Sequence, residues 1–247
     1  FGSGKSHFLK ILSYLLSNQE VCGKRAIDYF ADKFDDPMMY AQAVKSVSVP
    51  TQSILFNIDI EGPLTKDKTA VLRVFAKMFY NHCGFYGDDL KIAKLERFIE
   101  KQGKTQQFRE AFEKVNGAPW TETRDSFAFF EDDIVSVLQS TLGMSEQAAR
   151  NWFNGEETNE LSIAQLVADI QEYVDGKGKD FRLLFMVDEV GQYIGDDGDL
   201  MINLQSLVEE IGIRCHGKVW VMVTSQEAID SVVHITGNDF SKIQGRF

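Results

Sequence analysis

The 247-residue chain has few of the residues on which disulfide-rich or metal-centred folds depend. It holds three cysteines, four prolines and four histidines. Cys22, Cys83 and Cys215 lie at spacings that fit neither a zinc site nor a redox pair, so we expect reduced thiols in a cytoplasmic protein. The histidines form no ligand spacing and no pair with a nucleophile. A disulfide scaffold, a zinc centre and a catalytic triad are therefore not expected.

Long hydrophobic runs and a surplus of positive charge are also missing. The longest apolar runs, Leu183 to Val187 and Val219 to Val223, hold five residues each, whereas a helix needs roughly 20 to cross a bilayer. The net charge of −11 opposes wholesale coating of nucleic acid, although it leaves room for local basic surfaces. The length allows one sizeable core, or one core with a helical insertion. The 44% of hydrophobic and 26% of charged residues are the balance of an ordinary soluble globular protein.

The clearest motif is at the start of the chain. Gly2 to Ser6 match the second half of a phosphate-binding loop, in which glycines let the backbone approach the phosphates, the lysine reaches the β- and γ-phosphates and the serine hydroxyl ligates magnesium. A chance Gly-Ser-Gly turn before a helix is the alternative. We assign the binding of ATP to Gly2, Ser3, Gly4, Lys5, Ser6 and His7.

The remaining pattern predicts an α/β fold. Apolar residues at helical spacing predict a helix after the loop and further helices at roughly 24–34 and 38–47. Alternation of apolar and polar residues predicts a half-buried edge strand over 54–60. Helical periodicity fills 61–180, and two buried parallel strands at 183–187 and 219–223 flank a helix over 199–211 capped by Asp199. Because the loop lacks its first glycine and preceding strand, and the chain stops without a terminal signal, we expect truncation at both ends.

Two carboxylates follow the first buried strand directly. Strand ends of open α/β sheets point into the binding crevice, so Asp188 is expected to hold Mg²⁺ together with Ser6, and Glu189 to act as general base on the attacking water. An Asp-Glu pair can also merely solvate a turn. Its occurrence together with the loop favours the catalytic interpretation.

Three further residues are candidates for catalysis. Thr224 and Ser225 end the neighbouring strand, where a hydroxyl could meet the γ-phosphate or orient water, or could cap a helix. Arg246, near the end of the chain, could act on a neighbouring subunit as an arginine finger. A surface arginine in a salt bridge is the equal alternative for Arg246.

One helix face within the predicted insertion is basic. It carries Lys91, Lys94, Arg97, Lys101 and Lys104, opposite apolar residues. Interspersed acidic residues favour an ordinary solvated face over a stripe that contacts DNA.

Four segments together resemble a known family. They are Phe1 to Lys10 (FGSGKSHFLK), Leu184 to Gly195 (LFMVDEVGQYIG), Val219 to Asp230 (VWVMVTSQEAID) and Asp239 to Phe247 (DFSKIQGRF). They look like the large P-loop ATPase of bacteriophage exclusion (BREX) defence systems, called BrxC or PglY. The chain departs from that family in lacking the first strand, the first loop glycine and everything after Phe247.

The resemblance implies an AAA-type core of a larger cytoplasmic protein in phage restriction. It implies a homo-oligomer that binds ATP and Mg²⁺ and acts beside a DNA methyltransferase and an alkaline-phosphatase-like protein. It does not decide whether the protein contacts DNA. We expect a truncated P-loop NTPase sheet of the ASCE or AAA-like type, divided into 1–60, a helical insertion over 61–180, and 181–247. Alternatives are an ATP-binding scaffold that scarcely turns over and a module that chiefly binds DNA.

Overall fold

The computed structural model describes residues 4–63, 65–154 and 161–225, which form two compact units. We name the first, Phe1–Val74 with Ser162–Phe247, the sheet unit, and the second, Phe75–Leu161, the helical unit. The helical unit is narrower than the expected insertion of 61–180. The difference arises because residues 61–74 and the segment from Ser162 onward, which includes the helix α10 (Ile163–Gly176), belong to the sheet unit.

The sheet unit is α/β and is built on a three-stranded parallel sheet. Its strands are β3 (Thr51–Asn57), β4 (Arg182–Asp188) and β5 (Val219–Val223), in the order β3-β4-β5. Both strands predicted from their apolar runs are confirmed as parallel, and the strand near residue 54 lies at an edge of the described sheet as expected. The predicted burial holds for β4 but not for β5, of which only Val219 is buried while Trp220 is exposed, because β5 lies at the other edge of the described sheet. The side chains from Leu183 to Val187 are all buried, because helices cover both faces of the central strand.

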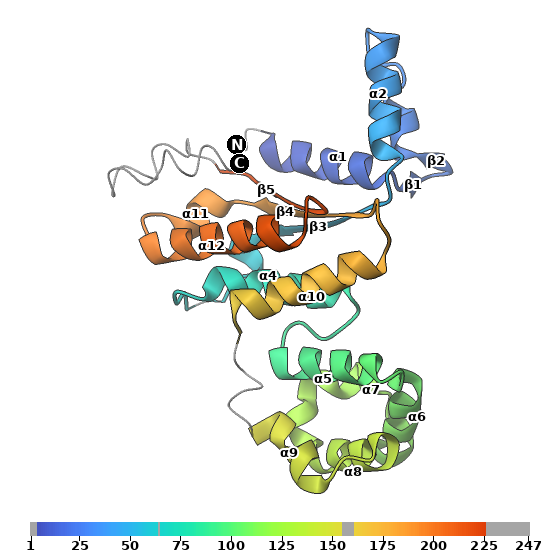
Figure 1. Ribbon diagram of the computed structural model, residues 1–247, viewed down its shortest axis with the longest axis vertical. Helices are drawn as coiled ribbons and strands as arrows, with labels where there is room; N and C mark the ends of the chain where they lie inside the picture. The colour runs from blue at the N-terminus through green and yellow to red at the C-terminus, as the bar shows by residue number, and fades with distance from the viewer. Residues whose placement is uncertain (1–3, 64, 155–160, 226–247) are drawn as a thin grey trace. The chain divides into compact units, whose positions relative to one another are not determined.

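Helices pack on both faces of this sheet (Figure 1). The helix α1 (Lys5–Ser17) covers one face, where Leu9 packs with Leu184 and Met186. On the other face lie α10 and α12 (Gly198–Arg214), and the hydroxyl of Tyr173 on α10 donates to Gln52 Oε1 of β3 at 2.7 Å. The remaining helices of this unit are α2 (Pro37–Val47), α3 (Ile58–Glu61) and α11 (Val190–Ile194).

The helix predicted over 24–34 is confirmed only in part, because a 3₁₀ helix occupies Ala26–Phe30 and no α-helix forms there. The chain forms a two-stranded antiparallel hairpin instead, β1 (Glu20–Val21) with β2 (Lys24–Arg25), followed by the 3₁₀ helix η1 (Ala26–Phe30). Cys22 and Gly23 between the strands have φ values of 49° and 78°. Two consecutive positive φ angles suit a tight hairpin turn, and the second strand of the hairpin takes up Lys24 and Arg25, the first two residues of the predicted helix.

Two predicted element boundaries also need correction. The edge strand ends at Asn57 rather than at residue 60, because the Asn57 side chain accepts from the amides of Asp59 and Ile60 and starts α3. The helix α12 is capped by Asp197, whose Oδ1 accepts from the amide of Asp199, and not by Asp199 itself. It also runs past residue 211 to Arg214.

The helical unit confirms the helical periodicity read from this part of the sequence. Its core joins side chains from five of its helices, with the Trp120 ring centroid 5.3 Å from that of Phe108 and 5.0 Å from that of Phe112. The helices of this region are α4 (Ala70–His82), which begins in the sheet unit, α5 (Leu90–Lys101), α6 (Thr105–Asn116), α7 (Trp120–Thr123), η2 (Arg124–Phe129), α8 (Glu131–Leu142) and α9 (Glu146–Asn154).

A buried carboxylate ties this core together. Glu96 on α5 is 7% exposed and accepts from the Tyr86 amide at 2.5 Å, Trp120 Nε1 at 2.7 Å and Arg124 Nη1 at 2.8 Å. Three donors satisfy a charge that would be costly to bury alone. Glu96 therefore has a structural role in the helical unit.

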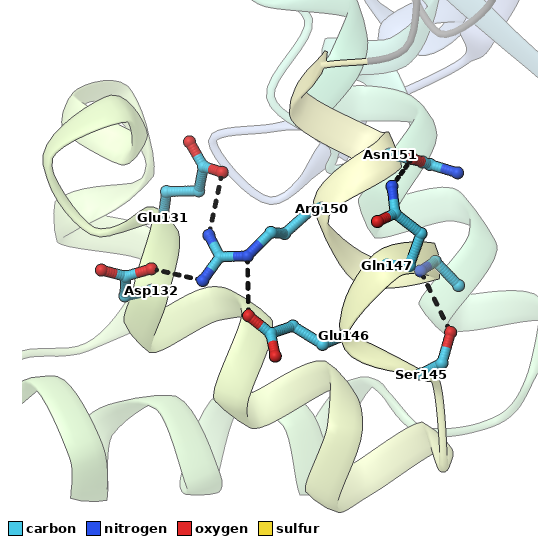
Figure 2. Close-up of polar contacts among 8 residues, drawn as sticks. Glu131, Asp132, Ser145, Glu146, Gln147, Arg150 and Asn151 are labelled. Carbon is cyan, nitrogen blue, oxygen red and sulfur yellow. Dashed lines mark hydrogen bonds and ion pairs between the residues drawn. The ribbon is translucent and has the colours of Figure 1, made fainter.

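On the surface of the same unit, one arginine joins α8 to α9 (Figure 2). Arg150 contacts Glu131 at 3.4 Å, Asp132 at 2.9 Å and Glu146 at 3.0 Å. The hydrogen bonds that the guanidinium donates to Asp132 and Glu146 raise its pKa above the usual value. Because the group is exposed, we regard the network as a weak fastening between the helices.

The predicted basic face, most of which lies on α5, is engaged within the chain. The ammonium of Lys91 donates to the carbonyl of Phe153 at 2.7 Å. This contact is consistent with an ordinary helix face. None of the helices in the described part of the chain is long and apolar enough to span a membrane.

Candidate functional site

The start of α1 is open to an anion. Gly4 precedes the helix with φ 78°, a left-handed conformation that favours glycine, and its carbonyl accepts from the amide of Phe8 at 2.8 Å. Within the described residues no side chain caps this helix start. The first-turn amides and the positive end of the helix dipole are thus available to a negatively charged ligand.

Lys5 brings the front of the chain to the end of the last described strand. Its ammonium donates to the carbonyl of Ser225, 220 positions further along the chain. Ser225 lies just beyond the carboxyl end of β5, so the loop lysine lies at the edge of the sheet where parallel strands end. Ser6 and His7 are exposed in the same helical turn.

The carboxyl ends of β4 and β5 are aligned and joined by a side-chain contact. Val187 pairs with Val223 in the parallel register, so the next residues, Asp188 and Thr224, are neighbours. The hydroxyl of Thr224 donates to Asp188 Oδ1 and accepts from the amide of Glu189 at 3.2 Å. The two strand ends therefore form one polar cluster beside Lys5.

Glu189 has a backbone conformation that is uncommon for its residue type. Its φ is 65° and ψ is 26°, in the left-handed region, immediately before α11. Residues other than glycine adopt this region at a cost of about 1–3 kcal/mol, and such residues are concentrated at functional sites. The side chain is half-buried.

Ser225 lies in close contact with the first turn of α11. Its hydroxyl is buried and has no hydrogen-bond partner among the described residues. A β-carbon added to Gly191 would lie 1.9 Å from Ser225 Oγ and 2.9 Å from Ser225 Cβ. No sequence pattern singles out Gly191, because the role of a glycine three residues after Asp188 depends on how closely Ser225 approaches it.

A second contact anchors the far end of α11. The ammonium of Lys66 lies 4.0 Å from the centroid of the Tyr193 ring and donates to the Tyr193 carbonyl at 2.9 Å. Burial, with smaller contributions from Asp59 and Asp67, raises the pKa of the Tyr193 hydroxyl above its usual value. The helix that follows Glu189 is therefore fixed at both of its ends.

The structure thus brings together most of the residues singled out in the sequence. Contacts connect Lys5 to Ser225 and Thr224 to Asp188 and Glu189, while Gly4, Ser6 and His7 share the turn of Lys5. Gly2, Ser3 and Arg246 lie outside the described residues. Thr224, expected to meet a γ-phosphate, to orient water or to cap a helix, bonds through its hydroxyl to the neighbouring strand end.

The donor set at this edge suits one kind of metal ion. In the described ranges no three or more His, Cys, Asp or Glu side chains gather as a metal-binding group. Mg²⁺ needs no such cage, because it is commonly held by one or two protein oxygens, substrate phosphates and water. The Ser6 hydroxyl and the Asp188 carboxylate, the two ligands expected from the sequence, are of that chemistry.

Comparison with known proteins identifies no family for this chain. No model of a known protein family matches the chain, and no solved structure matches it significantly.

Proposed function

We propose that this chain is the nucleotide-binding core of a P-loop ATPase of the ASCE or AAA-like type, which binds ATP with Mg²⁺ and hydrolyses it to ADP and phosphate. The observation that carries the proposal is the contact between Lys5 and the carbonyl of Ser225. This contact joins the loop lysine to the strand end whose neighbouring residue bonds to Asp188. A phosphate loop and an acidic strand end are the two parts that the chemistry requires at one edge of a sheet.

Binding of the phosphates falls to the first turn of α1. Its uncapped amides point toward the anion, and Gly4 admits the phosphates close to the backbone. Lys5 exchanges its bond to the neutral Ser225 carbonyl for one to a charged phosphate oxygen, which is the stronger acceptor. The Ser225 carbonyl thus holds the lysine near its ligand before binding.

The two carboxylates have different roles. Asp188, oriented by the Thr224 hydroxyl, holds Mg²⁺ together with Ser6. When bound, Mg²⁺ neutralises charge on the phosphates during transfer. Glu189 accepts a proton from the attacking water as general base. Its left-handed backbone conformation sets the direction in which its side chain leaves the main chain.

The resemblance to BREX ATPases supplies the wider setting of the proposal. On that basis we propose that the activity serves phage defence in the cytoplasm, in a homo-oligomer acting with a DNA methyltransferase and an alkaline-phosphatase-like protein. Arg246 then acts as the arginine finger of a neighbouring subunit.

The test is phosphate release and nucleotide binding by the complete protein and three variants. Lys5→Ala is expected to weaken ATP binding about 10- to 100-fold, because one charge-assisted hydrogen bond is lost. Glu189→Gln is expected to bind ATP normally and to lose about 10²- to 10⁴-fold in turnover. Lys10→Ala, an exposed lysine further along α1, is the matched control and should resemble the wild type.

Turnover that is unaffected by both Lys5→Ala and Glu189→Gln would refute the proposal. Binding of ATP that depends on Lys5, without hydrolysis even when the protein is oligomeric and loaded with DNA, would instead favour an ATP-dependent scaffold. Retention on DNA that is independent of nucleotide and falls steeply with salt would favour a DNA-binding module.

A further inference from the structure

The Thr224 hydroxyl is fully engaged between two backbone segments. A threonine hydroxyl has one proton to donate and two lone pairs to accept with. Here the proton goes to Asp188 Oδ1, and one lone pair accepts the amide of Glu189 at 3.2 Å. In this arrangement the hydroxyl has no proton left for a phosphate oxygen.

The backbone of Thr224 continues the pairing beyond the end of the sheet. Its amide donates to the carbonyl of Val187 at 3.0 Å, and its carbonyl accepts from the amide of Val190 at 3.0 Å. Backbone hydrogen bonds therefore join Thr224 to the residues just before and just after the turn Asp188–Glu189, and the Thr224 side chain bonds to the turn itself. Glu189 adopts φ 65° between these bonds.

A left-handed glutamate persists only where surrounding contacts determine it. The side-chain bond from the Glu189 amide to Thr224 is one of these contacts, and the same hydroxyl orients the carboxylate of Asp188. One hydroxyl thus controls the direction of both acidic residues at the strand end. Groups that orient ligands in this way affect metal affinity and activity about 10- to 100-fold.

We propose that Thr224 is a positioning residue, which sets the orientation of the Asp188 carboxylate and of the Glu189 backbone and does not contact the γ-phosphate. The proposal rests on the proposed function for the roles of the two carboxylates. It leaves Ser225, whose carbonyl accepts from Lys5 and whose buried hydroxyl has no partner in the described part of the chain, as the other hydroxyl at this strand end.

The variants that test the proposal are Thr224→Val, which keeps the shape and removes the hydroxyl, and Thr224→Ser, which keeps the hydroxyl. Thr224→Val is expected to lower kcat about 10- to 100-fold and to raise the Mg²⁺ concentration for half-maximal turnover by a similar factor. The KM for ATP should stay within about twofold, because the phosphate loop is unchanged. Thr224→Ser should restore both quantities.

Thr51→Val is the matched control. Thr51 is also a half-buried threonine at a strand end, but its hydroxyl donates to the Val49 carbonyl at 2.8 Å at the opposite end of the sheet. This variant should keep wild-type kcat and Mg²⁺ dependence. A kcat and Mg²⁺ dependence of Thr224→Val equal to those of the control would overturn the proposal, as would an equal defect in Thr224→Ser.

A second measurement is independent of hydrolysis. Hydrogen exchange at the Glu189 amide should be about tenfold faster in Thr224→Val than in the wild type or in Thr224→Ser, because that amide loses its acceptor. Equal exchange in all three proteins would overturn the proposal even if ATP turnover were normal. Faster exchange in a protein that neither binds nor hydrolyses ATP would uphold the role of Thr224 in the turn and refute the proposed function alone.

Discussion

Gly191 and Ser225 lie so close that the space for a β-carbon on Gly191 is filled by the Ser225 hydroxyl, at 1.9 Å. Ser225 also accepts the ammonium of Lys5 through its carbonyl. The first turn of α11, the residue after Thr224 and the loop lysine are consequently in mutual contact through one serine. A substitution that displaces Gly191 should therefore shift both the acidic turn at Asp188–Glu189 and the phosphate loop at Lys5.

Gly191→Ala should separate the chain at Ser225 from α11. Rotation of the hydroxyl alone does not relieve the overlap, because Ser225 Cβ would still lie 2.9 Å from the new methyl. We expect a loss of about 1–3 kcal/mol in the free energy of unfolding, measured with urea, together with reduced ATP turnover. Gly198→Ala is the control, since nothing lies within 4 Å of its β-carbon position. Equal stability of the two variants would contradict the packing described.

The backbone of Glu189 can be tested apart from its carboxylate. Glu189→Gly and Glu189→Ala both remove the carboxylate, but only glycine adopts φ 65° without steric cost. The glycine variant should be more stable than the alanine variant by about 1 kcal/mol in thermal or urea unfolding.

At Gln192, an exposed residue within α11, the order should reverse, because alanine is favoured over glycine inside a helix by about 0.5–1 kcal/mol. Alanine more stable than glycine at both positions would show that Glu189 is not held in the left-handed region.

The buried carboxylate of the helical unit gives a prediction about stability alone. Glu96→Ala leaves the indole of Trp120 and the guanidinium of Arg124 without their acceptor, so we expect a loss of about 3–5 kcal/mol in the free energy of unfolding. Glu100→Ala, an exposed residue on the same helix, should change it by less than about 0.5 kcal/mol. Urea unfolding followed by tryptophan fluorescence distinguishes these outcomes, and similar midpoints for both variants would contradict the buried network.

Local sequence pattern was sufficient to predict the strands that consist of an unbroken apolar run. Leu183–Val187 and Val219–Val223 are uniformly apolar, and both are strands of a parallel sheet. Local pattern failed where one turn decides the path of the chain. Cys22 and Gly23 form a hairpin turn just before the predicted helix of 24–34, and the Asn57 side chain ends a strand whose apolar alternation continues to Ile60.

The sequence by itself determined the α/β class, the strand positions and the residue types of the candidate site, because hydrophobic periodicity and a short loop motif are properties of neighbouring residues. Only the tertiary structure decided which of those residues touch. The bond of Lys5 to Ser225, the two bonds of the Thr224 hydroxyl and the approach of Ser225 to Gly191 all join distant segments. Such contacts depend on strand register and helix packing, which no local pattern specifies.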